Sequence, residues 1–273
     1  MLHSDFHMHS NFSGDSKAAL GHMVHGAVAR GLNTICFTDH NDPSFPYPCE
    51  EEIGMFDLDT ERYMNSLIQT ADLYKDKIDI RRGVEIGIQK HIYQELSEYI
   101  NKYAFDFVIG SSHLCQGMDP YYPQFWKDRS QKECLQSYFE DIRTNVHNFT
   151  DYDVYGHLDY VVRYAPTQNK DFRFSDYSDI LEDILKTIIE KGKGIEVNSA
   201  GFRQGLNAPN PCADILKLYR SLGGEILTTG SDAHKPEDIA FGYDKLEPLL
   251  LSCGFKYYTI FKARKPEFIP INK

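Results

Sequence analysis

Seven short apolar runs, separated by longer segments with helical periodicity, constrain the fold of this chain more than any other feature. The runs are rich in β-branched or aromatic residues and are bounded by Gly, Asp or Asn, as is typical of buried strands. They cover residues 5–9, 34–38, 78–84, 107–110, 153–155, 194–198 and 225–229. Helices are predicted between them at residues 18–30, 60–74, 94–102, 132–146, 179–191, 212–222 and 245–253. This alternation predicts an α/β protein with a parallel sheet and right-handed crossovers.

Potential metal ligands lie at or just beyond the ends of six of these runs. Imidazole combined with carboxylate suits Zn, Fe, Mn or Ni, and a carboxylate can bridge two cations. In a β/α barrel the carboxyl ends of the strands meet on one face, so these side chains would converge there. We therefore predict a seven-stranded, TIM-like (β/α)7 barrel with a polynuclear metal site. The candidate ligands are His7, His9, Asp15, His40, Glu85, His113, His157, Asp232 and His234.

The other histidines have less specific surroundings. His91 lies six residues beyond Glu85, and we assign it to substrate contact, although a loop residue without a function is equally compatible with this position. Surface, capping or structural roles are predicted for the remaining four, which are His3, His22, His25 and His147.

Composition narrows the class of protein. The 41% hydrophobic and 25% charged residues fit an ordinary globular chain, and no apolar run approaches the roughly 18 residues of a membrane span. The net charge of −11 argues against nucleic acid as a partner, although up to three divalent cations would make the cleft locally positive. Six scattered cysteines and a start without a basic or apolar leader predict a cytoplasmic protein.

Nothing in the sequence indicates more than one domain. No G-x-G-x-x-G or Walker-type loop follows any predicted strand, which disfavours a dinucleotide-binding sheet. No low-complexity linker interrupts the strand–helix rhythm, and we predict a single domain over residues 1–273. The sequence leaves the oligomeric state open.

The order of the motifs resembles one known family. H-x-H at 7–9 is followed by Thr-Asp-His at 38–40, Gly-x-Glu at 83–85, two lone histidines, and Ser-Asp-Ala-His at 231–234. This series resembles the polymerase and histidinol phosphatase (PHP) family, and the likeness extends from His7 to about Arg264. The resemblance implies a distorted seven-stranded barrel that holds up to three metal ions, with Zn, Mn or Fe as the expected metals.

The same resemblance implies how the ligands are shared. The first metal would take His7, His9, Glu85 and Asp232. The second would share Glu85 and take His113 and His157, whereas the third would take Asp15, His40 and His234. Relatives often have His at the position of Asp15, so the carboxylate here bears on which metal is preferred.

Within the family, the chain looks most like the stand-alone histidinol-phosphate phosphatases. The segments GVEIG at 83–87, GSSHL at 110–114 and FKARKP at 261–266 carry this narrower likeness. It implies hydrolysis of L-histidinol phosphate to L-histidinol and phosphate, in histidine biosynthesis, by a metal-bridging hydroxide. The alternative is a PHP phosphoesterase for another substrate, such as a nucleotide, a phosphotyrosine or a nucleic-acid end.

A small phosphomonoester needs further side chains around the metals. Arg163 and Arg203 are predicted to hold the phosphate with guanidinium forks, with a surface salt bridge as the alternative for each. Asn198, a poor metal ligand, is assigned to substrate contact. Asp42 is a candidate to protonate the leaving alkoxide, as is a metal-bound water. Asp39 and Asp159 are expected to orient neighbouring histidines.

Two long loops and an acidic insert complete the predicted pocket. Residues 41–57 and 116–129 are rich in Pro and Tyr, and loops of this length are usually functional. We expect them to cover the site. The acidic insert at residues 50–59 would supply a carboxylate for the substrate amine, or it is simply solvated.

Overall fold

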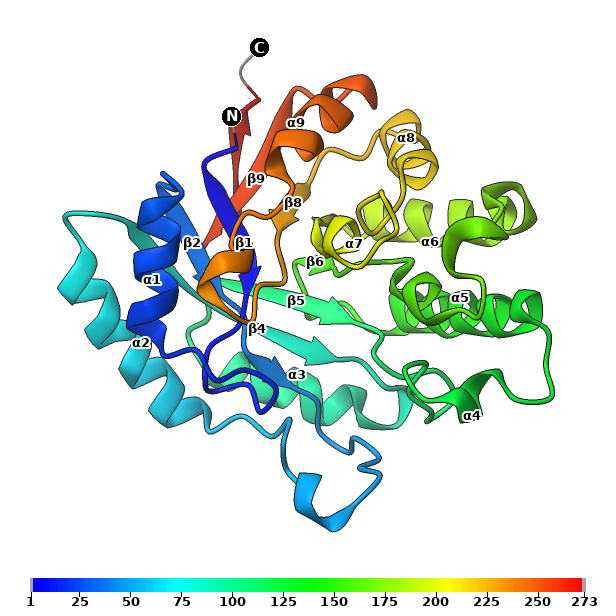
Figure 1. Ribbon diagram of the computed structural model, residues 1–273, viewed down its shortest axis with the longest axis horizontal. Helices are drawn as coiled ribbons and strands as arrows, with labels where there is room; N and C mark the ends of the chain where they lie inside the picture. The colour runs from blue at the N-terminus through cyan, green and yellow to red at the C-terminus, as the bar shows by residue number, and fades with distance from the viewer. Residues whose placement is uncertain (1, 272–273) are drawn as a thin grey trace.

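Eight strands form one curved parallel sheet in the computed structural model, which describes residues 2–271 (Figure 1). Seven of them follow the order β1-β2-β4-β5-β6-β7-β8, and a short β3 also pairs with β4. All seven predicted strands are confirmed, with ends that differ by a few residues. Their bounds are β1 Ser4–Met8, β2 Thr34–Phe37, β3 His40–Asn41, β4 Asp79–Gly87, β5 Phe107–Ser111, β6 Val154–Tyr155, β7 Gly194–Asn198 and β8 Leu227–Gly230.

The first and last strands bring the sheet almost to closure. Beyond their carboxyl ends, the Asp232 N–H donates to the His7 carbonyl at 2.8 Å, and the His9 N–H donates to the Ala233 carbonyl at 2.9 Å. Within the sheet, the buried Asp5 carboxylate accepts the Ser231 N–H at 2.9 Å. The result is the distorted seven-stranded α/β barrel that the sequence predicts.

Helices lie around the outside of this barrel (Figure 1). Each predicted helix is present, and local signals explain several of the ends. Ser130 and Glu133 form a capping box at the start of α5, and Asp59 caps α2 through the Arg62 N–H. The seven longer helices are α1 Leu20–Ala29, α2 Thr60–Tyr74, α3 Tyr93–Lys102, α5 Gln131–Asn148, α6 Ser178–Glu190, α8 Ala213–Ser221 and α9 Tyr243–Ser252.

Shorter helical turns occupy the loops. They are α4 Pro123–Trp126, α7 Ala200–Arg203 and the 3-10 turns η1 Glu50–Glu52, η2 Lys90–Ile92, η3 Tyr160–Tyr164, η4 Gln168–Lys170, η5 Phe174–Asp176 and η6 Pro236–Asp238. Across residues 2–271, no helix is both long enough and apolar enough to traverse a bilayer.

An antiparallel hairpin, β9 Tyr257–Lys262 and β10 Lys265–Pro270, was not predicted from the sequence. Its two turn residues, Ala263 and Arg264, adopt left-handed φ angles of +48° and +64°. Such turns normally carry Asn or Gly, so the usual sequence signal is missing. Contacts with the barrel hold the turn instead: the Ala263 N–H donates to Asp106 at 3.0 Å, and the Arg264 guanidinium binds Asp153.

The hairpin lies at the amino ends of the strands, on the side opposite the predicted site. Asp106 and Asp153 directly precede β5 and β6, and the buried Phe261 ring packs on Phe107 with centroids 5.0 Å apart. The hairpin therefore fills the base of the barrel and belongs to its hydrophobic core.

We expect Phe261→Ala to destabilise the protein by about 3–5 kcal/mol, because it leaves a cavity beside Phe107. Urea unfolding followed by circular dichroism measures this change. Phe268→Ala on the same hairpin is the matched control, since that ring is 46% exposed and its loss should cost no more than about 0.5 kcal/mol. Equal midpoints for the two variants would show that the hairpin does not support the core.

Candidate metal centre

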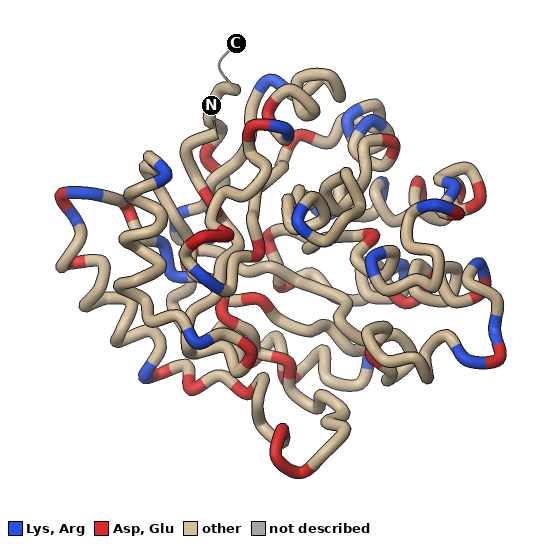
Figure 2. The backbone as a smooth tube through the Cα atoms, viewed as in Figure 1, with Lys and Arg blue, Asp and Glu red and all other residues tan. Residues whose placement is uncertain are grey.

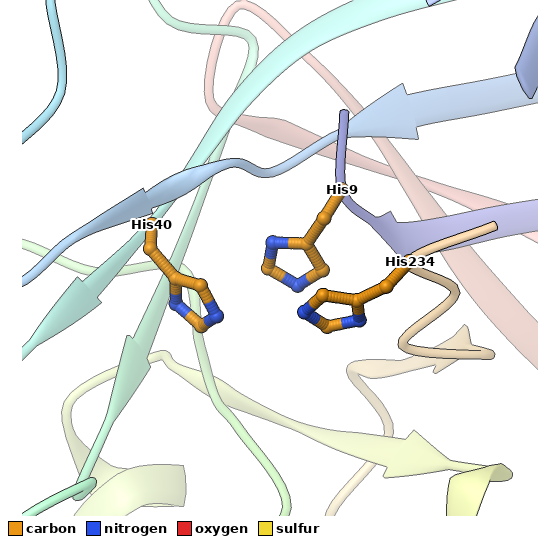
Figure 3. A group of neighbouring side chains, drawn as sticks. All are labelled: His9, His40 and His234. Carbon is orange, nitrogen blue, oxygen red and sulfur yellow. The ribbon is translucent and has the colours of Figure 1, made fainter. Parts of the chain in front are cut away.

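The nine predicted ligands meet at the carboxyl ends of the strands. Most of them line a cavity of about 420 Å³, beneath which His7 and His9 are fully buried. Figure 3 shows His9, His40 and His234 pointing toward one another from the segment just after β1, from β3 and from the loop after β8. Residues separated by up to 227 positions therefore share one site, because parallel barrel strands end on one face.

Glu85 occupies the centre of the cluster. Its Oε1 lies 3.1 Å from His113 Nε2 and 3.0 Å from His157 Nε2. Its Oε2 lies 3.0 Å from His7 Nε2 and 3.1 Å from His40 Nδ1. The two oxygens thus face two different sets of imidazoles, which is the geometry a bridging carboxylate requires.

His7 and His9 project from the same face of β1 and its end. Their Nε2 atoms are 3.0 Å apart, and Asp232 Oδ1 lies 3.7 Å from the first and 3.4 Å from the second. Two nitrogen lone pairs and a carboxylate in such a small space suit a cation.

A further group lies nearer to the cavity mouth. Asp15 Oδ2 is 3.0 Å from His234 Nε2 and 3.7 Å from His40 Nε2. The His9 and His234 rings stack with centroids 4.2 Å apart. This group therefore lies directly against His9, which is more deeply buried at the end of β1.

Two acids orient the imidazoles from behind. Glu196 Oε1 lies 2.6 Å from His7 Nδ1, and Asp42 Oδ2 lies 2.6 Å from His113 Nδ1. Each acid holds a proton on Nδ1, which leaves Nε2 available as a metal ligand. Glu196 also accepts the backbone N–H of His157 at 3.0 Å.

Glu196 was not predicted from the sequence. The available signal was a charged residue in the middle of the otherwise apolar run 194–198. Its partner lies on β1, and the contact depends on Gly230 of β8, where a Cβ atom would collide with both His7 and Glu196. Only the packed barrel reveals that pairing.

The protonation states of His9 and Glu85 suit metal ligation directly, whereas His7 would have to give up a proton to a cation. Burial, together with the neighbouring His234 and His40, lowers the pKa of His9 to about 3, so this ring is neutral at pH 7. Burial opposes ionisation of Glu85, but His7, His113 and His40 outweigh it and hold its pKa well below the usual range. Burial likewise disfavours a charged His7, whereas Glu196, Glu85 and Asp232 raise its pKa well above normal. A bound cation would compete with that proton.

The donor set therefore fits divalent cations. Unprotonated imidazole nitrogens and ionised carboxylates are the ligand forms of these groups. The buried His40 Nδ1 has no hydrogen-bond partner among residues 2–271 despite its closeness to Glu85. Overlapping groups of His and acidic side chains, each compact enough for one ion, run through the cluster; examples are His7/His9/Glu85, Glu85/His113/His157 and His9/His40/His234.

The two predicted phosphate-binding arginines reach the cavity. Arg163 stacks on the Tyr160 ring at 4.1 Å, and its Nη1 lies 3.9 Å from Asp232 Oδ2. Arg203 donates to the Asp232 carbonyl at 3.1 Å and lies 3.5 Å from the Asp238 carboxylate. Asp42 also lines the cavity.

The structure places two of the predicted substrate contacts, His91 and Asn198, outside the lining of this cavity. His91 is exposed in η2 and lines a separate pocket, because β4 continues to Gly87 and the chain then turns outward into α3. Asn198 is only 1% exposed; its Oδ1 accepts the Ala200 N–H at 2.9 Å and its Nδ2 lies 3.4 Å from Asp232 Oδ2. It holds an acid in place instead of facing the cavity.

The acids expected to orient histidines also differ from prediction. Asp159 binds Asn210 and the Cys212 N–H, and Asp39 binds Ser10 and Ser13. Within residues 2–271, neither makes a direct hydrogen bond with an imidazole, although Ser13 lies between Asp39 and His9.

Both long loops contribute to the cavity wall. Phe45, Glu52 and Phe56 come from the first, and Asp119, Tyr121 and Tyr122 come from the second. In Figure 2, acidic residues gather around the ends of the central strands and in the loop that projects at the lower edge, which contains η1. The cavity is therefore acidic and partly aromatic.

A β/α barrel with a buried cluster of histidines and carboxylates at its carboxyl face defines a metal-dependent enzyme. The PHP domain model matches residues 5–200. The chain is 33% identical to the histidinol-phosphatase of Lactococcus lactis, over 96% of this chain and 95% of that protein. The chain belongs to the PHP family.

Solved structures agree with this assignment. The Lactococcus lactis histidinol phosphate phosphatase, in complex with Zn, L-histidinol and phosphate, superposes with a TM-score of 0.89 over 98% of this chain and 100% of that one. A structure from Listeria monocytogenes, 18% identical, has a TM-score of 0.78 over 89% of this chain and 99% of its own, which supports the fold.

Glu196→Gln should weaken zinc retention by about 10–100-fold, because the amide is a poorer acceptor for the His7 Nδ1 proton. Metal analysis after dialysis against graded chelator measures this loss. Glu190→Gln on the exposed end of α6 is the matched control and should behave as wild type. Wild-type zinc retention in Glu196→Gln would contradict the orienting role.

Proposed function

We propose that this chain is a histidinol-phosphatase, a phosphoric monoester hydrolase that converts L-histidinol phosphate to L-histidinol and phosphate. One observation carries the proposal: a cavity lined by seven of the nine candidate ligands and by two arginines occurs in a chain that is 33% identical, along nearly its whole length, to an enzyme solved with Zn, L-histidinol and phosphate. The reaction places the protein in histidine biosynthesis.

The metal centre holds up to three divalent ions in this proposal, with Zn, Mn or Fe as the metals. His7, His9, Glu85 and Asp232 would hold the first, Glu85, His113 and His157 the second, and Asp15, His40 and His234 the third. The compact groups His7/His9/Glu85 and Glu85/His113/His157 support the first two sets, and the contacts of Asp15 with His234 and His40 support the third. Bound divalent cations supply an activated water and neutralise charge on the phosphoryl oxygens.

The arginines serve the phosphate. The Arg163 guanidinium lies against both the Tyr160 and the Tyr164 ring, at 4.1 and 4.6 Å from their centroids, and donates to the Tyr164 hydroxyl, which restricts its orientation. Arg203 is anchored by backbone carbonyls of the loop that carries Asp232. Each preorganised guanidinium group can offer a pair of N–H donors to two oxygens of a phosphoryl group.

We assign Asp42 a positioning role toward His113, with which it forms its close contact. Its Oδ1 is buried and has no hydrogen-bond partner within residues 2–271. Protonation of the leaving alkoxide by this oxygen is the alternative that the sequence analysis raised.

The remaining cavity wall suits a cationic, aromatic leaving group. Glu52 and Asp119 supply carboxylates for an amine, and the rings of Phe56 and Tyr121 supply flat apolar surface for an imidazole. The substrate is thus a small molecule that carries negative charge at one end and positive charge at the other.

The chain acts in this proposal as one cytoplasmic domain over residues 1–273. A single hydrophobic cluster that extends from Leu2 to Ile271 supports the interpretation as one domain. All six cysteines are free, and four of them are buried, as expected in a reducing compartment.

Purified protein should release phosphate from L-histidinol phosphate when loaded with zinc or manganese, and lose this activity when stripped by chelator. Phosphate release beside a generic aryl phosphate, a dinucleotide and phosphotyrosine measures the preference. Metal-dependent turnover of any of these in place of histidinol phosphate would retain the metal site and refute the substrate.

Arg163→Ala and Arg203→Ala should each lower kcat/KM by roughly 10- to 150-fold, the equivalent of about 1.5–3 kcal/mol for a hydrogen bond to a charged group. Steady-state kinetics on metal-loaded variants tests this. Arg173→Ala, at an exposed arginine, serves as the control. Unchanged catalytic efficiency in both cavity variants would eliminate the phosphate-binding assignment.

A further inference from the structure

Behind His9, a buried serine occupies the position that an acid occupies behind His7 and His113. Ser13 is 1% exposed, and its Oγ lies 3.0 Å from His9 Nδ1. The segment after β1 turns back here, because the Ser13 N–H donates to the Ser10 carbonyl at 3.0 Å. This turn brings the Ser13 hydroxyl to the Nδ1 edge of the His9 ring. His9 is therefore oriented by a neutral hydroxyl. Whether Ser13 Oγ donates to His9 Nδ1 or accepts from it depends on the other hydrogen bonds of that hydroxyl.

The surroundings determine where the Ser13 proton lies. Asp39 Oδ1 accepts the backbone N–H groups of Ser10 and Ser13 at 2.7 and 2.9 Å. A carboxyl oxygen that accepts two such bonds is the unprotonated one. The Ser13 hydroxyl, 2.8 Å from the same Oδ1, must therefore donate its proton to it.

The two lone pairs of Ser13 Oγ are then left to accept. The His40 N–H, 3.0 Å away, can only donate, so it takes one of them. His9 Nδ1 faces the other and must be protonated to use it. In this tautomer, His9 Nε2 carries a lone pair and points at His7 Nε2 and Asp232, 3.0 and 3.4 Å away.

We propose that Asp39 and Ser13 form a relay that fixes the tautomer of His9, so that its Nε2 is always presented to the metal centre. Both are positioning residues. Ser13 also holds the His40 backbone, so one hydroxyl sets the position of ligands on two different strands. Without it, His9 can place its proton on Nε2, where the cation would bind.

Imidazole nitrogen NMR tests the relay in the wild-type protein. Protein labelled with ¹⁵N-histidine is loaded with zinc, and the His9 signals are assigned by their loss in His9→Gln. We expect a proton on Nδ1 and a zinc-shifted Nε2. The opposite pattern, with the proton on Nε2 or zinc on Nδ1, would overturn the proposal.

Variants test its consequence. Ser13→Ala should retain zinc about 10–100-fold more weakly than wild type in chelator competition. Ser13→Thr keeps the hydroxyl and should stay within about twofold of wild type. Ser199→Ala is the matched control, because Ser199 is equally buried and its hydroxyl has no hydrogen-bond partner within the described residues 2–271.

Equal zinc retention in Ser13→Ala and wild type would refute the relay, as would a loss in Ser13→Ala that is matched by Ser199→Ala. Melting temperatures identify a variant that fails to fold. If Ser13→Ala does not fold, the NMR pattern of the wild-type protein tests the relay by itself. The inference rests on the proposed metal centre but not on the substrate: a wrong substrate would change turnover and leave the tautomer and the zinc competition unaffected.

Discussion

The Glu85 carboxylate, buried among four imidazoles at the carboxyl end of the barrel, is the interaction on which the rest of the site depends. An isolated ionised carboxylate in this interior would be costly, and it is stable only because positive charge surrounds it. His113 and His157 face one oxygen, whereas His7 and His40 face the other. Strands from opposite sides of the barrel must therefore converge on this single residue, and a bound cation would serve the same electrostatic purpose.

Orientation of the rings requires a further layer of contacts. Glu196 and Asp42 hold their histidines from behind, and Asn198 holds Asp232. These groups come from strand interiors and loop bases, where packing limits the side-chain conformations. Because the contacts of Glu196 and Asp42 set which imidazole nitrogen faces inward, the barrel controls the chemistry of the centre through residues that stand behind the candidate ligands.

The two ends of the barrel contribute differently: one contributes to stability, and the other forms the cavity. The hairpin at the base packs Phe261 on Phe107 and is anchored by Asp106 and Asp153, so it contributes stability. At the other end, long loops bring Glu52 and Asp119 to the cavity wall. Loops can vary there without loss of the core, which is how barrels of one architecture come to accept different substrates.

The sequence alone determined the strands and longer helices and showed which candidate donors stand at the strand ends. Apolar runs with flanking turn residues predicted seven strands, and the residue types at their ends predicted the nine donors, because both signals are local. Positions beyond the strand ends were less certain. His91 was misplaced because β4 extends to Gly87, and the hairpin was missed because Ala263 and Arg264 do not look like turn residues.

Only the tertiary structure decided which groups meet. Glu196 and His7 are 189 residues apart, and Ser13 contacts Asp39, His40 and His9 through a turn that no periodicity describes. Such pairings depend on strand order, on register and on the close approach that Gly230 permits between β8 and β1. Secondary structure follows from short-range patterns, whereas the orientation of a ligand follows from packing between strands that are distant in the chain.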